Sequence, residues 1–149
     1  MPYEALLIVL LGLPFAAGLS ALFMRPGARN AVAWLSTGAA LACLILTVLL
    51  YPVIADAAVA KKVVAWAPSL GLDLVLRVDG FAWIFLILVF GIGSLVGIYA
   101  RYYMSPEDPV PRFFAYLLAF MGSMVGVVMS GNVIQLVFFW ELTSLFSFL

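Results

Sequence analysis

Long apolar runs separated by short polar breaks dominate this chain. A helix that crosses a bilayer needs about 20 predominantly apolar residues. Five runs approach or reach that length, and turn-forming Pro, Gly and Asn residues stand between them. They cover residues 5–24, 31–54, 81–100, 113–129 and 133–149. The pattern therefore predicts an all-α integral membrane protein with about five transmembrane helices.

The longest break, residues 55–80, has a different periodicity. Polar and apolar side chains alternate from Leu72 to Asp79, and residues 63–66 are also rich in β-prone side chains. Alternation with a period of two is typical of a strand that lies with one face on an apolar surface. We predict a short β-hairpin over residues 61–79 on the membrane surface. Asp79 is expected to cap the helix that follows.

Two pairs of glycines at a spacing of four lie within the apolar runs. Gly93 pairs with Gly97, and Gly122 pairs with Gly126. Small residues at this spacing let helix backbones approach closely. We expect ordinary helix packing at both pairs, and a flexible hinge at residues 91–93 is the alternative.

Composition agrees with a membrane location. The chain is 67% hydrophobic and 9% charged, with a mean hydropathy of +1.25. A soluble domain carries about 25% charged residues, so a lipid bilayer is the expected surroundings. The net charge is zero, which gives no indication of a nucleic-acid partner. With no histidine and one cysteine, Cys43, we expect no cofactor, no metal site and no intrachain disulfide.

The first apolar run lacks the features of a cleaved signal peptide. The four residues before it include Glu4 and no basic residue, whereas a signal peptide begins with a positively charged segment. We therefore expect residues 5–24 to be retained as the first transmembrane helix.

Basic residues in short loops predict the orientation of the chain. With five spans, four arginines fall on one side, namely Arg25, Arg29, Arg101 and Arg112. The opposite side holds Lys61, Lys62 and Arg77, all of them in the long break. Because short loops weigh more in this rule, the arginine side is predicted to be cytoplasmic and the N-terminus to lie outside.

Glu141 is the acidic residue that lies in the middle of an apolar run. If Asn132 caps that run, Glu141 lies nine residues into the helix, which is about 13 Å at about 1.5 Å per residue. Half of a hydrocarbon core is about 15 Å thick, so the carboxyl group is predicted near the bilayer midplane. Placing an acid there costs about 2.5 kcal/mol or more, and acids inside membranes are functional by default.

Hydrocarbon surroundings favour the protonated form of a carboxyl group. We therefore predict that Glu141 takes up and releases protons in an ion or proton path, with Ser144, one helical turn further, placed to hydrogen-bond the carboxylate or a water. Thr143 and Ser147 face elsewhere and are expected to bond to their own helix. The five runs contain no Lys, Arg or His, so a cationic partner would lie outside them. The alternative is a protonated Glu141 that is bonded to a neighbouring helix and has no transport role.

Three further polar residues have predicted roles near the membrane surface. Gln135 is expected to be structural. Asp79 is expected to be a helix cap. The alternative is that Arg77 and Asp79 form an ion cluster at the mouth of a pathway.

Several short motifs, taken in order, resemble those of antiporter-like membrane subunits. They occupy residues 66–71, 76–81, 98–104, 112–116 and 140–144. The combination is most similar to the A subunit of Mrp-type multisubunit Na⁺/H⁺ antiporters. The proton-pumping antiporter-like subunits of respiratory complex I are related, but a glycine usually follows their Trp-Glu pair. Here Leu142, Thr143 and Ser144 follow it, which favours the Mrp type.

The resemblance implies a secondary transporter subunit and not an enzyme. Residues 1–149 would be the N-terminal part of a larger helical domain built from inverted repeats, ending inside the fifth helix. The implied location is the bacterial inner membrane, and the implied transported ions are Na⁺ and H⁺. The implied partners are the remaining helices of the same subunit, whose lysines would act with Glu141, and other subunits of a hetero-oligomeric complex. A proton-pumping subunit of an NADH:quinone oxidoreductase and a membrane scaffold without an ion path are the alternatives.

Overall fold

The computed structural model describes residues 3–24, 29–57, 59–67, 69, 72–103 and 110–148. Residues 25–28 and 104–109, where the sequence predicted turns or loops, lie outside the described residues, as does Leu149. The side chains of Arg29 and Lys62 are likewise not described. The helices are α1 (Tyr3–Leu22), α2 (Arg29–Leu49), α3 (Tyr51–Ala57), α4 (Gly80–Tyr103), α5 (Val110–Val128) and α6 (Val133–Phe148). The strands are β1 (Val59–Ala67) and β2 (Leu72–Asp79).

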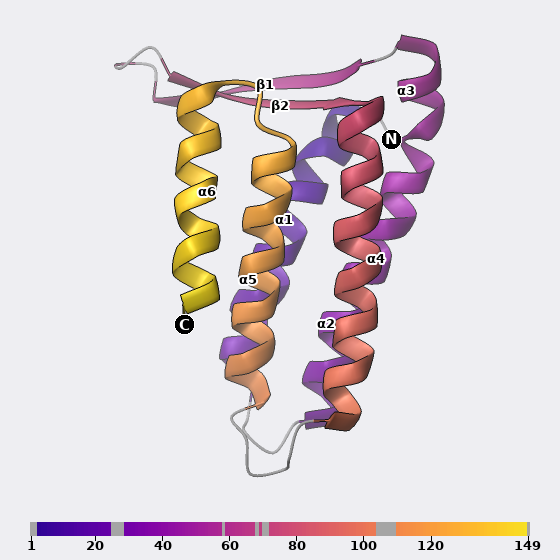
Figure 1. Ribbon diagram of the computed structural model, residues 1–149, viewed down its shortest axis with the longest axis vertical. Coiled ribbons are helices and arrows are strands. Elements are labelled where there is room, and N and C mark those ends of the chain that lie inside the picture. Colours follow the sequence, from indigo (N-terminus) through magenta and orange to yellow (C-terminus); the bar gives the residue numbers. More distant parts are fainter. Residues whose placement is uncertain are drawn as a thin grey trace.

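The long helices form an upright bundle, and the hairpin lies across one of its ends (Figure 1). Helix α1 packs on α5, α2 packs on α4, and α6 packs on α5. Successive long helices run in alternate directions, so the start of α1 is at the hairpin end and the end of α4 is at the opposite end. This alternation agrees with the sidedness that the sequence predicted for the loops.

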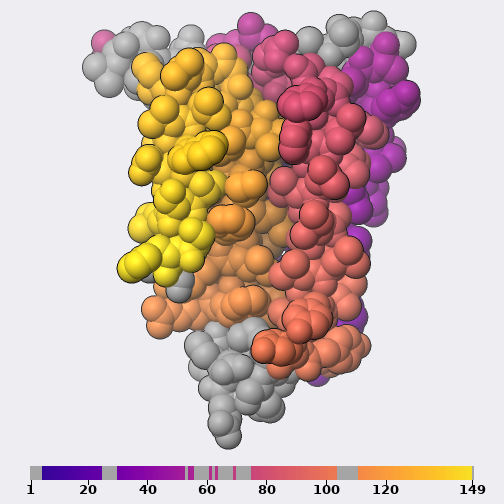
Figure 2. Space-filling view, in the orientation of Figure 1, coloured from indigo at the N-terminus to yellow at the C-terminus, as the bar shows by residue number. Residues whose placement is uncertain are grey.

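Within the described ranges, four helices are long and apolar enough to cross a membrane. They are Ala5–Leu22, Asn30–Leu49, Gly80–Tyr103 and Pro111–Val128. The last apolar run forms α6, which is also apolar but has 16 residues. The outer surface of the bundle carries many exposed large apolar side chains, Ile45, Ile92 and Leu95 among them. Helices α4, α5 and α6 make up most of the face seen in Figure 2. The predicted helical membrane fold is confirmed.

The second helix is shorter than the sequence predicted. It ends at Leu49, and α3 begins at Tyr51, where one helix was expected over residues 31–54. Pro52 has no N–H to offer to the preceding turn, which weakens the helix at this point. The indole Nε1 of Trp83 donates a hydrogen bond of 2.7 Å to the carbonyl of Thr47 and so stabilises the end of α2.

The predicted hairpin is confirmed. Strands β1 and β2 are antiparallel, with Val63 opposite Val75. Leu76 and Val78 are fully buried and join the main core cluster of the bundle, whereas Arg77 between them is exposed. The alternation along β2 thus places its apolar face on the helix ends and its charges outward.

The spaced glycines lie at close helix contacts, as predicted. A Cβ added to Gly97 would lie 2.6 Å from the hydroxyl of Thr37, and one added to Gly122 would lie 2.8 Å from the ring of Phe15. Gly126 faces the ring of Phe139 across the α5–α6 contact. These glycines let neighbouring helices approach more closely than any larger residue would allow.

Candidate functional site

The turn between α5 and α6 is bonded to the hairpin. The backbone N–H of Arg77 donates to the carbonyl of Met129 at 2.8 Å, and the N–H of Gly131 donates to the carbonyl of Val75 at 2.9 Å. Helix α6 then begins where predicted, because Asn132 Oδ1 accepts a hydrogen bond of 2.8 Å from the backbone N–H of Gln135. The pairing of this turn with β2 was not foreseen from the sequence, which offers little sign of it beyond the small Gly131.

Gln135 is the buried polar residue of the first turn of α6. It has no exposed surface, and its Oε1 accepts a hydrogen bond of 2.8 Å from the backbone N–H of Val75. Its Nε2 has no hydrogen-bond partner among the residues that the structure describes. The contact with β2 confirms the structural role predicted for Gln135.

Two buried side chains set the face that α6 turns towards α5. Gln135 and Phe139 are one helical turn apart and are the buried residues of this helix. Glu141 follows Phe139 by two residues, which is about 200° around the helix axis. It is exposed, as is Ser144. The carboxyl group that the sequence singled out therefore lies on the face of α6 that is turned away from α5.

The level of Glu141 along the bundle follows from the lengths of α5 and α6. The two helices lie side by side and run in opposite directions from the turn at residues 129–132 (Figure 1). Glu141 is eight residues beyond Val133, about 12 Å along α6, and half the length of the 19-residue α5 is about 14 Å. The carboxyl group is therefore level with the middle of α5. Within the described chain it has no hydrogen bond or ion pair.

The hydroxyl groups near Glu141 divide as predicted. Thr143 Oγ1 donates to the carbonyl of Trp140, and Ser147 Oγ donates to the carbonyl of Ser144 at 3.1 Å. Both hydroxyls are therefore used by their own helix. The side chain of Ser144 shares the exposed face with Glu141, but within the described chain the two side chains are not hydrogen-bonded. The part of Ser144 in an ion path stays a prediction.

Arg77 and Asp79 form an ion pair at the hairpin end of the bundle. Arg77 Nη1 and Asp79 Oδ2 are 3.1 Å apart, and Asp79 Oδ1 accepts a hydrogen bond of 2.8 Å from the backbone N–H of Ala82. The second bond confirms the predicted cap of α4. The N–H of Ala82, helped by the nearby Arg77, holds the pKa of Asp79 below its usual value. A role for this pair at the mouth of a pathway stays a prediction.

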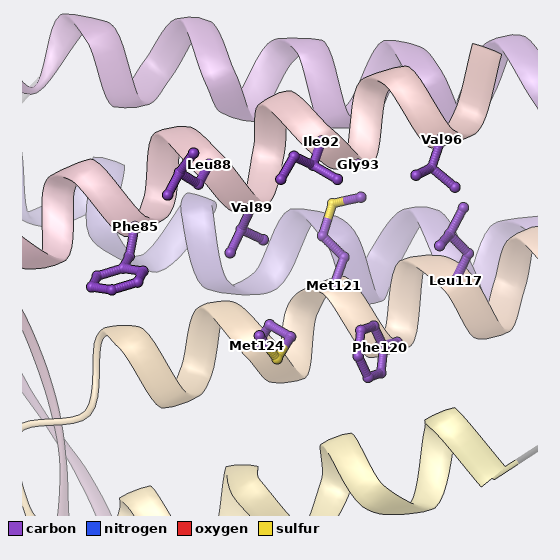
Figure 3. Close-up of a pocket in the computed structure, with 10 residues that line it drawn as sticks. All are labelled: Phe85, Leu88, Val89, Ile92, Gly93, Val96, Leu117, Phe120, Met121 and Met124. Carbon is purple, nitrogen blue, oxygen red and sulfur yellow. The ribbon is translucent and has the colours of Figure 1, made fainter. Parts of the chain in front are cut away.

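A groove between α4 and α5 offers no chemistry of its own. Its volume is about 340 Å³, and its walls are entirely apolar (Figure 3). They consist of Phe85, Leu88, Val89, Ile92, Gly93, Val96, Leu117, Phe120, Met121 and Met124. No side chain in it can carry a proton or supply an oxygen ligand to a hard cation. In the described part of the chain, no three His, Cys, Asp or Glu residues gather as a metal site would require.

One curated protein is similar to this chain over nearly its whole length, and others are similar over more than half of it. A probable K⁺/H⁺ antiporter A/B subunit of Rhizobium meliloti is 54% identical over 146 residues, which is 98% of this chain and 15% of that protein. The chain is related to cation/proton antiporter A subunits. An A1 subunit of an Na⁺/H⁺ antiporter of Staphylococcus aureus is 49% identical over 88 residues, 59% of this chain and 11% of that protein. Residues 66–114 match a family described as the N-terminus of chain 5 of NADH-ubiquinone oxidoreductase (complex I).

Solved structures share the fold. The Mrp complex from Dietzia sp. contains a chain that superposes with a TM-score of 0.80 at 26% identity, covering 95% of this chain and 15% of that one. An archaeal membrane-bound sulfane sulfur reductase matches with a TM-score of 0.80 at 17% identity, over 94% of this chain and 22% of that one. The latter likeness shows the fold alone.

These matches agree with the resemblance to antiporter-like membrane subunits that the sequence motifs indicated. By name the curated relatives are transporter subunits and not enzymes, as predicted, and the chain is a multi-pass membrane protein. The chain spans about 15% of the length of the Rhizobium relative.

Proposed function

We propose that this chain is the N-terminal part of the membrane domain of a monovalent cation/proton antiporter subunit, with Glu141 as a protonation site in its ion path. The observation that carries the proposal is the place of Glu141, level with the middle of a membrane-spanning helix and on an exposed face of α6. The 54% identity to an antiporter subunit supports the transport class.

The exposed position of Glu141 has an energetic consequence. An acid that faced lipid at this depth would cost about 2.5 kcal/mol or more, even on the lower insertion scales. Acids inside membranes almost always face other protein or a water-filled cavity. The face of α6 that carries Glu141 and Ser144 is therefore expected to meet further helices of the same subunit, with a cationic or hydrogen-bonding group opposite the carboxyl.

Arg77 and Asp79 are proposed to stand where this path reaches the membrane surface. They lie at the hairpin end of the bundle, and β2, which carries them, is also bonded to the turn that begins α6. An exposed ion pair at such a position can attract and orient small ions, although its own contribution to stability is small.

The bacterial inner membrane is the proposed location, with the N-terminus outside. The other subunits of a hetero-oligomeric antiporter complex are the proposed partners. Na⁺ is the proposed exchanged cation; the named relatives include both K⁺/H⁺ and Na⁺/H⁺ antiporter subunits, so both ions are to be tested.

The decisive experiment replaces the carboxyl group in the complete complex. Glu141→Gln and Glu141→Ala, reconstituted into vesicles, are expected to abolish proton movement driven by Na⁺ or K⁺ gradients while the complex still assembles. Thr143→Val is a matched control, because that hydroxyl is bonded to its own helix, and it should transport normally. Normal transport by both Glu141 variants would rule out the protonation site.

A proton-pumping subunit of a complex I type enzyme is the second candidate. The description of the matching family, chain 5 of complex I, favours it. NADH-driven quinone reduction that co-purifies with the subunit would support this alternative. Cation-driven proton movement without such an activity would support the antiporter. A scaffold without an ion path would lose only stability in the Glu141→Gln variant.

A further inference from the structure

The helix that carries Glu141 is attached to the surface hairpin at its N-terminal end. Three hydrogen bonds join β2 to the segment that leads into α6. The carbonyl of Met129 accepts from Arg77, the N–H of Gly131 donates to Val75, and Oε1 of Gln135 accepts from Val75. The first two bonds hold the turn, and the third is made by a side chain of α6 itself.

The side chain of Gln135 does not make the hydrogen bond that is common for a glutamine at this helix position. A Gln three residues after the cap often folds back onto the backbone of the cap residue, in a capping box. Here the Oε1 of Gln135 reaches β2 instead, 60 residues earlier in the sequence. Its neighbours Val133 and Ile134 are 72% and 55% exposed, whereas Gln135 has no exposed surface. The first turn of α6 is therefore oriented with Gln135 pointing into the hairpin.

The backbone of Val75 has no other partner to replace this bond. In a strand, the N–H and C=O of one residue point to the same side. Val75 uses its C=O for Gly131 and its N–H for Gln135, so both groups face away from β1. Loss of the Gln135 acceptor would leave this part-buried N–H without its hydrogen bond, which is unfavourable.

Rotation of α6 would move Glu141 directly. Gln135 and Glu141 are about 120° apart around the helix and about 9 Å apart along it. Phe139, whose ring packs against Gly126, is a second contact that fixes the rotation. With Gln135 released, α6 would keep its packing on α5 but lose the side-chain bond that sets its rotation relative to β2.

We propose that Gln135 is a positioning residue for Glu141. Through its hydrogen bond to the backbone of Val75, it fixes the rotation of α6 and thereby aims the carboxyl group at the groups that complete the ion path. This inference rests on the proposed function of Glu141. It also gives the hairpin a role in transport, because β2 provides the backbone group that holds α6 in its rotation.

The test removes the same hydrogen bond from either side, in the complete complex reconstituted into vesicles. Gln135→Leu deletes the acceptor, and Val75→Pro deletes the donor on the side of β2 that does not pair with β1. Gln135→Glu keeps an acceptor oxygen. Leu136→Ala, at the next position of α6, is the control for loss of an apolar side chain without loss of this bond. Transport is measured per assembled complex.

We expect Gln135→Leu and Val75→Pro each to lower the transport rate about tenfold or more, since misplacement of a reacting group by about 1 Å is enough for losses of this size. Gln135→Glu should restore most of the rate, and Leu136→Ala should leave it unchanged. The double variant of Gln135→Leu with Val75→Pro has no unsatisfied partner, so it should assemble. It should nevertheless transport as poorly as either single variant.

Three results would overturn the proposal. They are a normal rate per assembled complex in Gln135→Leu, an equal loss in Gln135→Glu and Gln135→Leu, and recovery of transport in the double variant, which indicates a structural role alone. Glu141→Gln is measured in the same preparation. Transport that persists in Glu141→Gln refutes the protonation site itself, so failure of the two proposals can be distinguished.

Discussion

The contact between Gly126 and Phe139 allows the packing of α6 to be tested quantitatively. A Cβ added at Gly126 would lie 2.7 Å or less from three ring carbons of Phe139. Carbon atoms pack best at about 3.5–4.0 Å, so the ring, and with it α6, would have to retreat by about 1 Å. Overpacking of this kind costs about 1–3 kcal/mol. Gly126→Ala is therefore expected to destabilise the subunit.

The same substitution elsewhere gives the control. A Cβ on Gly38, in the middle of α2, would meet no atom within 4 Å. There, alanine gains about 1 kcal/mol in helix propensity over glycine. Gly126 also lies in a helix and gains the same propensity, so the two Gly→Ala variants should differ by the overpacking cost alone, about 1–3 kcal/mol in the free energy of unfolding.

A denaturant titration of the complete subunit in detergent micelles measures this difference. Adding Phe139→Leu to Gly126→Ala should recover part of the loss, because the smaller side chain makes room for the new methyl group. If Gly126→Ala were as stable as Gly38→Ala, the close α5–α6 contact, and the direction of Glu141 derived from it, would be wrong.

Two further predictions concern the ends of the bundle. Asp79→Ala should lower the free energy of unfolding by about 1 kcal/mol through loss of the α4 cap, whereas Asp79→Asn keeps a capping oxygen. Because the pKa of Asp79 is lowered in the folded chain, the stability that its charge adds is present above the unfolded pKa of about 3.9 and is lost as the pH falls through the lower folded pKa. The advantage of the wild type over Asp79→Asn at pH 6 should therefore shrink as the pH falls below about 3.9, and a difference that does not change with pH would contradict this cause. The second prediction concerns the topology and uses single cysteines in a Cys43→Ala background. A cysteine in place of exposed Lys61 should react with an impermeant thiol reagent from outside the cell, and a cysteine in place of exposed Tyr102 should react only after permeabilisation. The reverse pattern of labelling would show that the predicted orientation is inverted.

Most of the secondary structure could be predicted from the sequence because lipid imposes a strict rule. Backbone groups in hydrocarbon must be bonded within the chain, so a long apolar run has one stable form, the helix. The alternation of Leu76 and Val78 with Arg77 and Asp79 likewise predicted a strand with one buried face. The predicted end of the second helix was wrong. Counting apolar residues takes no account of Pro52, which has no N–H to donate to the preceding turn.

Glu141 could be found from the sequence because an acid in an apolar run is costly wherever the helix packs. Its depth followed from counting residues after Asn132. Its direction could not be predicted. The face on which it lies depends on which side of α6 meets α5, and that is decided by Phe139 fitting against Gly126 and by Gln135 reaching β2.

The sequence by itself determined the class of the protein, its helices and hairpin, the cap at Asn132 and the acidic residue within an apolar helix, because each of these depends on local patterns and on the solvent. The tertiary structure alone decided that the turn at residues 129–131 pairs with β2 and that Gln135 is bonded to Val75. It also decided that Glu141 faces away from α5. These contacts join residues up to 60 positions apart. They depend on how the helices pack, and the local sequence of one helix does not specify which element it will contact.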